Sequence, residues 1–564
     1  MFEKQTGQSG MDARSPTTYY VAPNGNNSNP GTFDRPWATP AYGAKQLQPG
    51  DTLIIRSGRY ILRDFGEDMI TPPQGRPGAW ITIKGETDKR PVLVGTNNLY
   101  AAFEISNASY LRIENLEITS DLKDPFRGGI SAWDPAAHIV LNNLHIHHLD
   151  EGGIDLRDIV DLTLLNSRIE YCGFGAIGGP RGNQGGWRNI LIKNCRLSYS
   201  GHYYQGGPGP SPYDRPDGFG IEPSNGPIEI ADTVVEHNRG DGLDSKAANT
   251  YIHHCIVANN SCDGIKVWGN NSKIENCLIY GTGDGDTSPS PWAGIVIDQI
   301  EQAGSGFQII NTTLANDRRE HGYLMYVQYG GGVPITLMLK NCIMSHGPGR
   351  VYIGSNVTFT SDHNLFYLPG QNVPIEVAGR EYTAAEIESG ALGPGNLARD
   401  PLFVKLSLSD PDGYQLQAGS PAINAGTIQG APADDLRHRA RPYGSAPDMG
   451  AFEWQGPAQP PTVVKSDPVN NATGVPVNKK ITVTFSESVT KGSTFSKIAL
   501  KNAKGKTVAV TKSISGNQLT IIPRSNLAYN TRHTVTIPAK AVKDLEGNPL
   551  VLPYTFSFTT KAKT

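Results

Sequence analysis

The sequence predicts an all-β protein, in which a parallel β-helix, a solenoid of short stacked strands, is followed by a small β-sandwich. Between about residues 100 and 350 two short phrases recur. Their clean intervals are 22 to 24 residues, which suits one solenoid turn of three strands and three bends. Apolar and polar residues alternate within these phrases, as in strands with one buried face. The 64 glycines and 41 prolines among 564 residues indicate many turns.

The N-terminal part begins with a polar stretch, residues 1–16, that includes a second methionine at position 11. It lacks the apolar run of a signal peptide, so we expect a tag or a disordered segment there. Residues 17–60 contain Tyr-Tyr-Val-Ala-Pro-Asn-Gly and Pro-Gly-Asp-Thr-Leu-Ile-Ile, and they resemble the opening of secreted right-handed parallel β-helix proteins. We expect a short helix near residues 41–47 to cap the open end of the solenoid, whose core and strand edges need cover.

The repeated region combines two kinds of phrase. One places an asparagine after an apolar strand, and its copies contain Asn115, Asn143, Asn166, Asn194, Asn276 and Asn341. Stacked amides hydrogen-bond along a solenoid and satisfy the backbone at bends, so we assign these asparagines a structural role and no chemistry. The other phrase is a Gly-rich turn that enters a strand. Its copies are Gly152-Gly-Ile, Gly175-Ala-Ile, Asp217-Gly-Phe, Asp241-Gly-Leu, Asp263-Gly-Ile and Ala293-Gly-Ile.

Longer intervals between the phrases mark loops inserted on one side of the solenoid. The largest are 178–188, 199–216 and 281–292. Insertions that gather on one face of a solenoid usually form its binding face, so we expect ligand contacts there.

The six cysteines follow no zinc-binding spacing, and four occupy one position of the repeat: Cys195, Cys255, Cys277 and Cys342. A small apolar side chain at a repeated position is typical of a core. We therefore expect buried, unpaired thiols in preference to disulfides.

The C-terminal third changes character twice. Residues 351–454 lose the strict period, and phrases such as Asp400-Pro-Leu-Phe and Pro447-Asp-Met-Gly-Ala-Phe-Glu resemble the closing segment of bacterial β-helix proteins. We expect the last turns and the C-terminal cap there, so that the β-helix domain covers residues 17–454. A Pro-rich linker at 455–462 leads to residues 463–564, whose short alternating strands predict a β-sandwich.

The predicted sandwich carries the phrases Pro468-Val-Asn-Asn-Ala-Thr-Gly-Val-Pro and Phe485-Ser-Glu-Ser-Val. They resemble the bacterial Ig-like domains of S-layer and secreted proteins, and the resemblance implies a secreted or cell-surface protein. The net charge of −3 gives no argument for a nucleic-acid partner. No apolar run reaches roughly 18 residues, so we expect no membrane insertion. We expect a monomer.

Three consecutive copies of the Gly-rich phrase begin with aspartate, at Asp217, Asp241 and Asp263. An Asp-Gly pair is common at a bend, but three in successive rungs are less easily explained by bends alone. Because side chains alternate faces along a strand, each phrase has an inner and an outer set. The inner set includes Phe219, Leu243 and Ile265, and the outer set forms two columns: Gly220, Asp244 and Lys266, and Glu222, Lys246 and Trp268.

Stacked rungs lie about 4.8 Å apart, so the carboxylates of these phrases would crowd together beside Lys266. Clustered carboxylates repel one another unless a cation lies among them, and hard oxygen ligands suit Ca²⁺. We predict a calcium site, whose ligands are Asp217, Asp241, Asp244 and possibly Asp263.

Lys266 is the predicted catalytic residue. A divalent cation nearby and partial desolvation both lower the pKa of a lysine, and a neutral amine can act as a general base. In a uronic acid polymer the C5 proton lies next to a carboxylate that calcium can bridge. Transfer of that proton to Lys266 with loss of the 4-O-glycosidic bond is β-elimination, the reaction of a polysaccharide lyase.

The run from Asp217-Gly-Phe through Gly240-Asp-Gly-Leu-Asp244 to Asp263-Gly-Ile-Lys266 resembles family 9 polysaccharide lyases, the calcium-dependent pectate lyases and their rhamnogalacturonan-cleaving relatives. The resemblance implies the calcium ligands and the base given above, and pectate (homogalacturonan) as the substrate. Rhamnogalacturonan, alginate and glycosaminoglycans are the alternative substrates. Two departures stand out: Gly240 occupies the place of an aspartate, and the segment before Lys266 is shorter than in the family.

Substrate contacts are predicted from residues in the same rungs and loops. Guanidinium groups suit uronate carboxylates, and aromatic rings can stack on sugars. The candidates are Arg157, Arg181, Arg215, Arg239, Tyr203, Tyr204 and Trp268. Lys246 lies on the same face and is the rival of Lys266 for the role of base.

Three other functions compete with the lyase. A β-helix glycoside hydrolase would use an acid and a base without calcium, but the Gly-His-Gly and Arg-Ile-Lys phrases associated with such polygalacturonases are absent. A uronan C5-epimerase would share the proton abstraction. A non-catalytic glycan-binding adhesin would need the loops but no lysine beside calcium.

Overall fold

The computed structural model describes residues 15–207, 215–283, 293–315, 318, 323–328, 332–347, 349–456, 460–544 and 547–563. Most of the polar stretch 1–16, and parts of the loops 199–216 and 281–292, lie outside these residues. The chain divides into two compact units, Met1–Trp454 and Gln455–Thr564. No helix among the described residues is long and apolar enough to cross a membrane.

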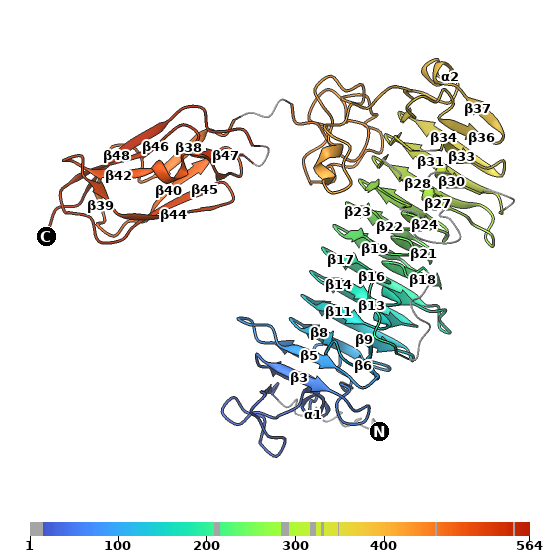
Figure 1. The fold of residues 1–564 in the computed structure, drawn as a ribbon, viewed down its shortest axis with the longest axis horizontal. Coiled ribbons are helices and arrows are strands. Elements are labelled where there is room, and N and C mark those ends of the chain that lie inside the picture. The colour runs from blue at the N-terminus through green and yellow to red at the C-terminus, as the bar shows by residue number, and fades with distance from the viewer. Residues whose placement is uncertain are drawn as a thin grey trace, which may run out of the picture. The chain divides into compact units, whose positions relative to one another are not determined.

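The first unit is the parallel β-helix that the period predicts, with its rungs stacked in sequence order from blue to yellow in Figure 1. Its described strands form three long sheets, each of which receives about one strand per turn. In these sheets all neighbours are parallel except β36 and β37.

Sheet 1 consists of β1 (Thr18–Val21), β2 (Thr52–Ile55), β4 (Ile81–Gly85), β7 (Ser109–Glu114), β10 (Ala136–Asn142), β13 (Ile159–Leu165), β16 (Trp187–Lys193), β19 (Ile228–Ala231), β22 (Thr250–His253), β25 (Ser272–Glu275), β28 (Ser305–Ile310), β31 (Ile335–Lys340) and β34 (Val357–Asp362). Sheet 2 consists of β3 (Arg59–Leu62), β5 (Val92–Gly95), β8 (Glu117–Ser120), β11 (His145–Leu149), β14 (Arg168–Cys172), β17 (Arg196–Ser198), β20 (Val234–Glu236), β23 (Ile256–Ala258), β26 (Leu278–Tyr280), β29 (Thr313–Ala315), β32 (Ile343–Ser345) and β35 (Leu365–Tyr367).

Sheet 3 consists of β6 (Leu99–Glu104), β9 (Phe126–Ala132), β12 (Gly152–Leu156), β15 (Gly175–Gly179), β18 (Phe219–Ser224), β21 (Leu243–Ala247), β24 (Ile265–Val267), β27 (Ala293–Ile297), β30 (Tyr323–Val327), β33 (Val351–Ile353), β36 (Ile375–Val377) and β37 (Arg380–Tyr382). It contains all three acidic rungs.

The core fills the space between the three sheets because alternate residues of each strand point inward. Phe219, Leu243 and Ile265 are 0 % exposed, and each is paired in register with the next. The predicted inward stack is therefore confirmed.

The repeated asparagines lie at bends, as predicted. All six have a positive φ, for example 56° at Asn115 and 54° at Asn143, a conformation that asparagine tolerates better than most residues. Asn143 Nδ2 donates to Asn115 Oδ1 at 2.9 Å, and Asn194 Nδ2 donates to Asn166 Oδ1 at 2.6 Å. These amide bonds support the predicted structural role at the bends.

The cysteines are buried, as expected for core positions. The short helix near the N-terminus is α1 (Pro40–Lys45), whose Ala41 and Ala44 belong to the main core cluster. A capping box at Thr383 and Glu386 begins α2 (Ala384–Glu388), which follows β37.

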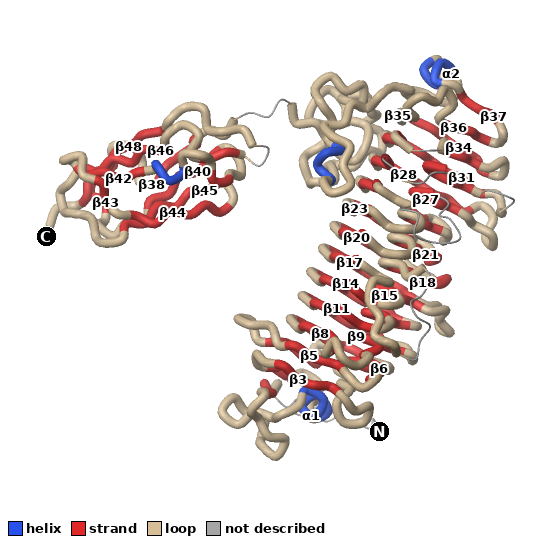
Figure 2. Tube along the Cα trace, in the orientation of Figure 1, coloured by secondary structure: helices blue, strands red, loops and turns tan. Residues whose placement is uncertain are grey.

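The segment after α2 corrects one expectation. Residues 398–454 do not close the end of the solenoid but cover the outer face of sheet 2, with one short 3-10 helix, η1 (Pro411–Tyr414), among loops (Figure 2). Sheet 2 carries outward apolar side chains there, including Ile256, Leu278 and Leu365. Phe403, Tyr414, Leu416, Leu436, Met449 and Phe452 pack on them because such a face cannot be left in water.

The second unit has its own core and antiparallel sheets. One sheet consists of β38 (Val463–Asp467), β40 (Ile481–Phe485), β45 (Gln518–Pro523) and β44 (Val510–Ser515). The other consists of β39 (Ala472–Val475), β48 (Tyr554–Thr560), β46 (Arg532–Ile537), β42 (Ala499–Asn502) and β43 (Thr507–Val508), where β39 alone pairs in parallel. The pair β41 (Thr490–Lys491) and β47 (Val542–Lys543) and the 3-10 helix η2 (Phe495–Lys497) complete it.

Candidate active site

The first outward column is aligned as the sequence predicts. Asp244 on β21 lies opposite Gly220 on β18 and Lys266 on β24. The second column is interrupted, because the register between β18 and β21 shifts after Ile221. Glu222 and Lys246 still meet through their side chains, whose charged atoms lie 3.1 Å apart.

The first aspartate of each acidic rung forms part of a hydrogen-bonded ladder. Asp217 Oδ1 accepts the backbone N–H of Asp241 at 2.7 Å, and Asp241 Oδ1 accepts that of Asp263 at 2.9 Å. Asp263 Oδ1 in turn accepts the backbone N–H of Ala293 at 2.8 Å. These aspartates therefore stabilise the bends with one oxygen, and the second oxygen of each remains for other contacts.

Asp217, Asp241 and Asp244 form a carboxylate cluster, since one oxygen of each lies within 4.8 Å of the others. Burial and the charges of Asp241 and Asp244 raise the pKa of Asp217 well above its usual value. Burial also raises the pKa of Asp244, although Lys266 and Lys246 partly oppose this. A cation bound among these carboxylates would lower both pKa values, because it favours the ionised forms.

One observation in particular indicates that this cluster can hold a cation. Asp244 Oδ1 is buried and has no hydrogen-bond partner among the described residues. A buried carboxylate oxygen without a partner is costly, and three hard oxygen donors this close suit Ca²⁺. Asp217, Asp241 and Asp244 would hold the ion.

Asp263 does not belong to the three-residue cluster. It is 1 % exposed, and its Oδ2 lies 3.7 Å from Lys266 Nζ. Gly240 cannot be replaced by aspartate without rearrangement, because an added Cβ would lie 2.4 Å from Asp217 Oδ1 and 2.5 Å from the carbonyl oxygen of Arg215. An aspartate at position 240, as in the family pattern, would therefore require this bend to change.

Lys266 lies against the cluster with its side chain 12 % exposed, and its Nζ donates to Asp241 Oδ2 at 2.9 Å. Burial disfavours the charged ammonium, but the charges of Asp241, Asp244 and Asp263 outweigh burial and raise the pKa of Lys266 above its ordinary value. The sequence led us to expect a lowered pKa beside an ion. In the ion-free protein the same carboxylates act in the opposite direction.

Lys246, the rival base, connects the cluster to a cleft. Its Nζ lies 3.3 Å from Asp244 Oδ2 as well as 3.1 Å from Glu222 Oε1, and these contacts offset burial and raise its pKa. The cleft has a volume of about 600 Å³. Its lining includes Arg181, Glu222, Lys246, Trp268, Asn270 and Gln299.

The predicted substrate residues separate into two groups. Arg181, Lys246 and Trp268 line the cleft, and Lys266 Nζ lies 6.0 Å from the centre of the Trp268 ring. Arg215 lies close to the cluster, where its Nε contacts Cys262 Sγ at 3.1 Å and the charges of Asp241 and Asp263 help to raise its pKa against burial.

The remaining four contact other parts of the fold. Arg157 stacks over the Trp133 ring at 4.7 Å. The Tyr203 hydroxyl shares a hydrogen bond with Ser120 Oγ, and the Tyr204 hydroxyl donates to the carbonyl oxygen of Gly207. The Arg239 side chain packs against Gly201.

Sequence reasoning missed Asp155 on β12, which belongs to the same outward column. The column runs from Asp155 through Gly178 and Gly220 to Asp244. Asp155 Oδ1 is buried without a hydrogen-bond partner among the described residues, and burial, with help from Glu151, raises the pKa of Asp155 to about 6. The phrase Gly152-Gly-Ile-Asp aligns Asp155 with Lys266, so the repeat itself held the signal.

Comparisons with known proteins agree with this architecture. The family model described as "Pel9A-like, right handed beta helix region" matches residues 19–324, and the model described as "Bacterial Ig-like domain" matches residues 457–560. Over 147 residues the chain is 27 % identical to the uncharacterized protein YwoF of Bacillus subtilis (strain 168). That match covers 24 % of this chain and only 30 % of the length of YwoF.

Among solved structures, similarity in fold comes with low sequence identity. The structure of XylC with xylose superposes with a TM-score of 0.52 at 12 % identity, over 78 % of this chain and 99 % of that chain. The pectate lyase Pel9A gives a TM-score of 0.46 at 19 % identity, over 78 % of this chain and 96 % of that chain.

Proposed function

The chain belongs to the Pel9A-like right-handed β-helix family, and on that premise we propose that it is an extracellular polysaccharide lyase. It cleaves a uronic-acid-containing polymer by β-elimination, with Ca²⁺ as cofactor and Lys266 as the base. Pectate (homogalacturonan) is the proposed substrate, and rhamnogalacturonan, alginate and glycosaminoglycans are the alternatives.

One observation supports this function above all. A lysine that is only 12 % exposed lies 2.9 Å from a carboxylate of a cluster in which another buried oxygen has no partner. A base beside a cation site is the arrangement that removal of a proton next to a carboxylate requires. A purely structural role at bends explains the hydrogen bonds between the rungs, but it does not explain why Asp244 Oδ1 is buried without a hydrogen-bond partner among the described residues.

The residues would divide the reaction among them. Lys266 Nζ, in its neutral form, accepts the C5 proton of the uronate, and the electron pair of that C–H bond forms the C4–C5 double bond. The bond between C4 and its glycosidic oxygen breaks, and the departing oxygen keeps the electron pair and takes a proton from water. When bound at Asp217, Asp241 and Asp244, calcium would neutralise the substrate carboxylate and compensate the charges that otherwise keep Lys266 protonated. Trp268 and Arg181 in the adjoining cleft would hold neighbouring sugars by stacking and by charge.

The extracellular setting is supported by the second unit, which the bacterial Ig-like domain model matches. Such a domain would display or tether the lyase outside the cell, where acidic polysaccharides occur.

Glycoside hydrolysis is the second candidate function. It is favoured by the cluster of carboxylates in which burial raises the pKa of Asp217, because a glycosidase pairs a carboxyl group of raised pKa with an ionised carboxylate. The two functions differ in their products, since only elimination leaves a C4–C5 double bond.

A panel of polymers tests the proposal. Pectate, rhamnogalacturonan, alginate and a glycosaminoglycan are each incubated with the protein and Ca²⁺, and ultraviolet absorbance and reducing ends are followed together. We expect both signals to rise with pectate. A rise in reducing ends without a rise in absorbance would favour hydrolysis. No rise of either signal with any polymer would contradict both proposed activities, elimination and hydrolysis.

A further inference from the structure

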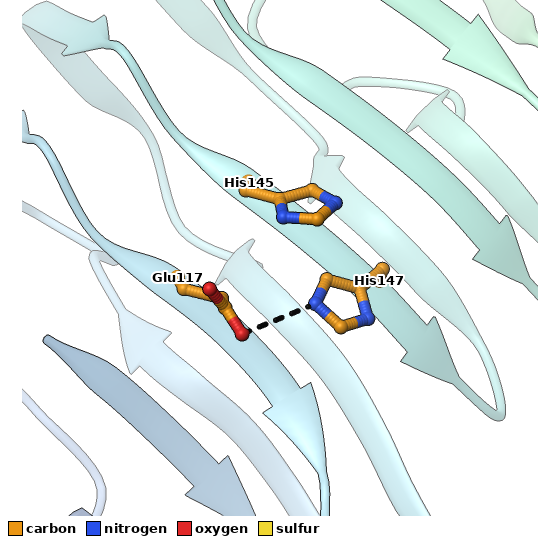
Figure 3. A group of neighbouring side chains, drawn as sticks. All are labelled: Glu117, His145 and His147. Carbon is orange, nitrogen blue, oxygen red and sulfur yellow. Dashed lines mark ion pairs between the residues drawn. The ribbon is translucent and has the colours of Figure 1, made fainter. Parts of the chain in front are cut away.

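A second group of metal-binding side chains lies on sheet 2, separate from the acidic rungs of sheet 3. Glu117 is on β8, and His145 and His147 are on the next strand, β11. His145 lies in register with Glu117, and His147 follows two residues later on the same face. One ligand atom of each residue lies within 4.8 Å of the other two, and Figure 3 shows the carboxylate and both rings facing one another.

His145 is held by a carboxylate from the following rung. Its Nε2 lies 3.0 Å from Glu170 Oε1, and Glu170 is itself paired with Arg168 at 2.6 Å. The opposite ring nitrogen, Nδ1, is turned toward Glu117 and His147 in Figure 3. A ligating histidine commonly donates its other ring N–H to a carboxylate in this way, which fixes the tautomer and ring orientation.

His147 is oriented through its other nitrogen. Nδ1 of His147 lies 2.7 Å from Nδ1 of His148 and 3.2 Å from Thr119 Oγ1. When His147 donates from Nδ1, its Nε2 carries a lone pair, and this atom lies 3.5 Å from Glu117 Oε1.

Nε2 of His147 is an anomaly in the absence of a cation. It is buried and has no hydrogen-bond partner among the described residues. With Nδ1 as the donor, the lone pair of Nε2 faces Glu117 Oε1, a carboxylate oxygen, at 3.5 Å. Two acceptors side by side in a buried position repel each other unless a cation lies between them.

We propose that Glu117, His145 and His147 bind one divalent transition-metal ion, with Zn²⁺ as the best-suited ion. Two imidazoles and one carboxylate are a common zinc ligand set, and they leave a fourth position for water. Nitrogen ligands disfavour Ca²⁺, so this site and the acidic cluster would take different ions. The ion would cross-link β8 and β11 and stabilise the solenoid there.

A second histidine group provides the contrast. Asp232, His254 and His438 also have ligand atoms within 4.8 Å of one another. However, both nitrogens of His438 are already bonded to carboxylates, to Asp232 at 2.6 Å and to Asp434 at 2.8 Å. This group is satisfied as an ion-pair network that fastens residues 434–438 to the β-helix.

Metal titration tests the proposal. The His438→Ala protein, which lacks the second group, is titrated with Zn²⁺ by calorimetry and with Co²⁺ by visible absorption. Thermal unfolding is measured in parallel. We expect one Zn²⁺ site per chain, a visible Co²⁺ spectrum typical of nitrogen ligation, and a higher Tm with Zn²⁺. Adding His147→Ala should weaken Zn²⁺ binding by at least about a hundredfold, because even a lost outer-shell partner costs 10–100-fold.

Two further variants make the test decisive. Glu117→Gln keeps the side-chain shape, so the variant should fold normally but bind Zn²⁺ far more weakly than the His438→Ala protein does. His253→Ala is the matched control, since His253 also stands beside a histidine and a glutamate, His254 and Glu229, but belongs to no three-ligand group with them. It should retain full binding. Absence of saturable Zn²⁺ binding in the His438→Ala protein, or unchanged binding in both Glu117→Gln and His147→Ala, would overturn the proposal.

Discussion

At the scale of single residues, the acidic rungs use each aspartate twice. Oδ1 of Asp217, Asp241 and Asp263 accepts a backbone N–H from the next rung, which is the ordinary work of an aspartate at a bend. The other oxygens meet Asp244 and Lys266. Structural and functional roles therefore coexist in one side chain, and neither excludes the other.

Calcium binding should release protons. Burial and neighbouring charges raise the pKa of Asp217, and the carboxylates raise the pKa of Lys266. Both groups therefore keep their protons up to a higher pH than free side chains do. A cation binds the ionised carboxylates and repels the ammonium, so binding expels protons and the affinity rises with pH. Calorimetry in buffers of different ionisation enthalpy measures the release. Proton uptake, or an affinity that falls between pH 6 and 8, would contradict this account.

The unpartnered oxygen of Asp244 gives a second residue-scale prediction. Asp244→Asn keeps the side-chain shape and removes the charge of a buried carboxyl group, whose pKa is raised by burial. In a chelator the variant should unfold at the same Tm as the unmodified chain or higher, because a poorly compensated charge is gone. Added Ca²⁺ should raise the Tm of the unmodified chain but hardly that of the variant. An equal calcium shift in both proteins would exclude Asp244 as a ligand.

At the scale of strands, the outward column of sheet 3 has a gap. Gly178 and Gly220 separate Asp155 from Asp244, so these two rungs add no side chain of their own to the column. A polymer could follow this gap along the solenoid, between a carboxyl group at one end and the acidic cluster at the other.

Filling the gap should impair turnover without unfolding the protein. A Cβ at Gly178 would come no nearer than 3.5 Å to its nearest neighbour, Asp155 Oδ1, and valine suits a strand. Gly178→Val should keep its Tm but lose at least about tenfold in kcat/KM, because a poorly placed substrate loses transition-state binding. Gly306→Val, on sheet 1, is the control and should keep full activity. Equal kcat/KM in both variants would show that the polymer does not use this gap.

The sequence predicted the strands well because the period and the alternation are local. They were enough to place Phe219 inside and Asp244 beside Lys266. Asp155 was missed although the repeat aligns it with Lys266, because two glycine rungs separate it from Asp244. The period and the alternation also do not give the pKa of Lys266 in the ion-free protein, since it depends on three carboxylates that converge from separate rungs.

At the scale of the whole molecule, each unit carries its own hydrophobic core. The segment 398–454 has too little regular structure to be recognised by period. Its role becomes visible only with the outward apolar residues of sheet 2 that it covers.

Two truncations separate these parts. Ending the chain after Trp454 removes the second unit and should change the Tm of the β-helix by less than about 2 °C. Ending it after Leu397 also uncovers the apolar face of sheet 2, where each large side chain is worth about 1.5–3 kcal/mol. That Tm should fall by at least about 5 °C. Similar Tm values for the two truncations would refute the covering role.

The most direct test of the proposed function compares Lys266→Ala with Lys246→Ala on pectate at saturating Ca²⁺, by the rate of ultraviolet absorbance increase. General bases typically contribute 10²–10⁴-fold, so Lys266→Ala should lose at least about a hundredfold in kcat while keeping its Tm. Lys246→Ala removes the contacts to Glu222 and Asp244 but leaves the proposed base in place, so it should keep more activity. Full activity of Lys266→Ala with loss in Lys246→Ala would contradict the assignment of the base, and full activity of both would contradict a lysine base altogether.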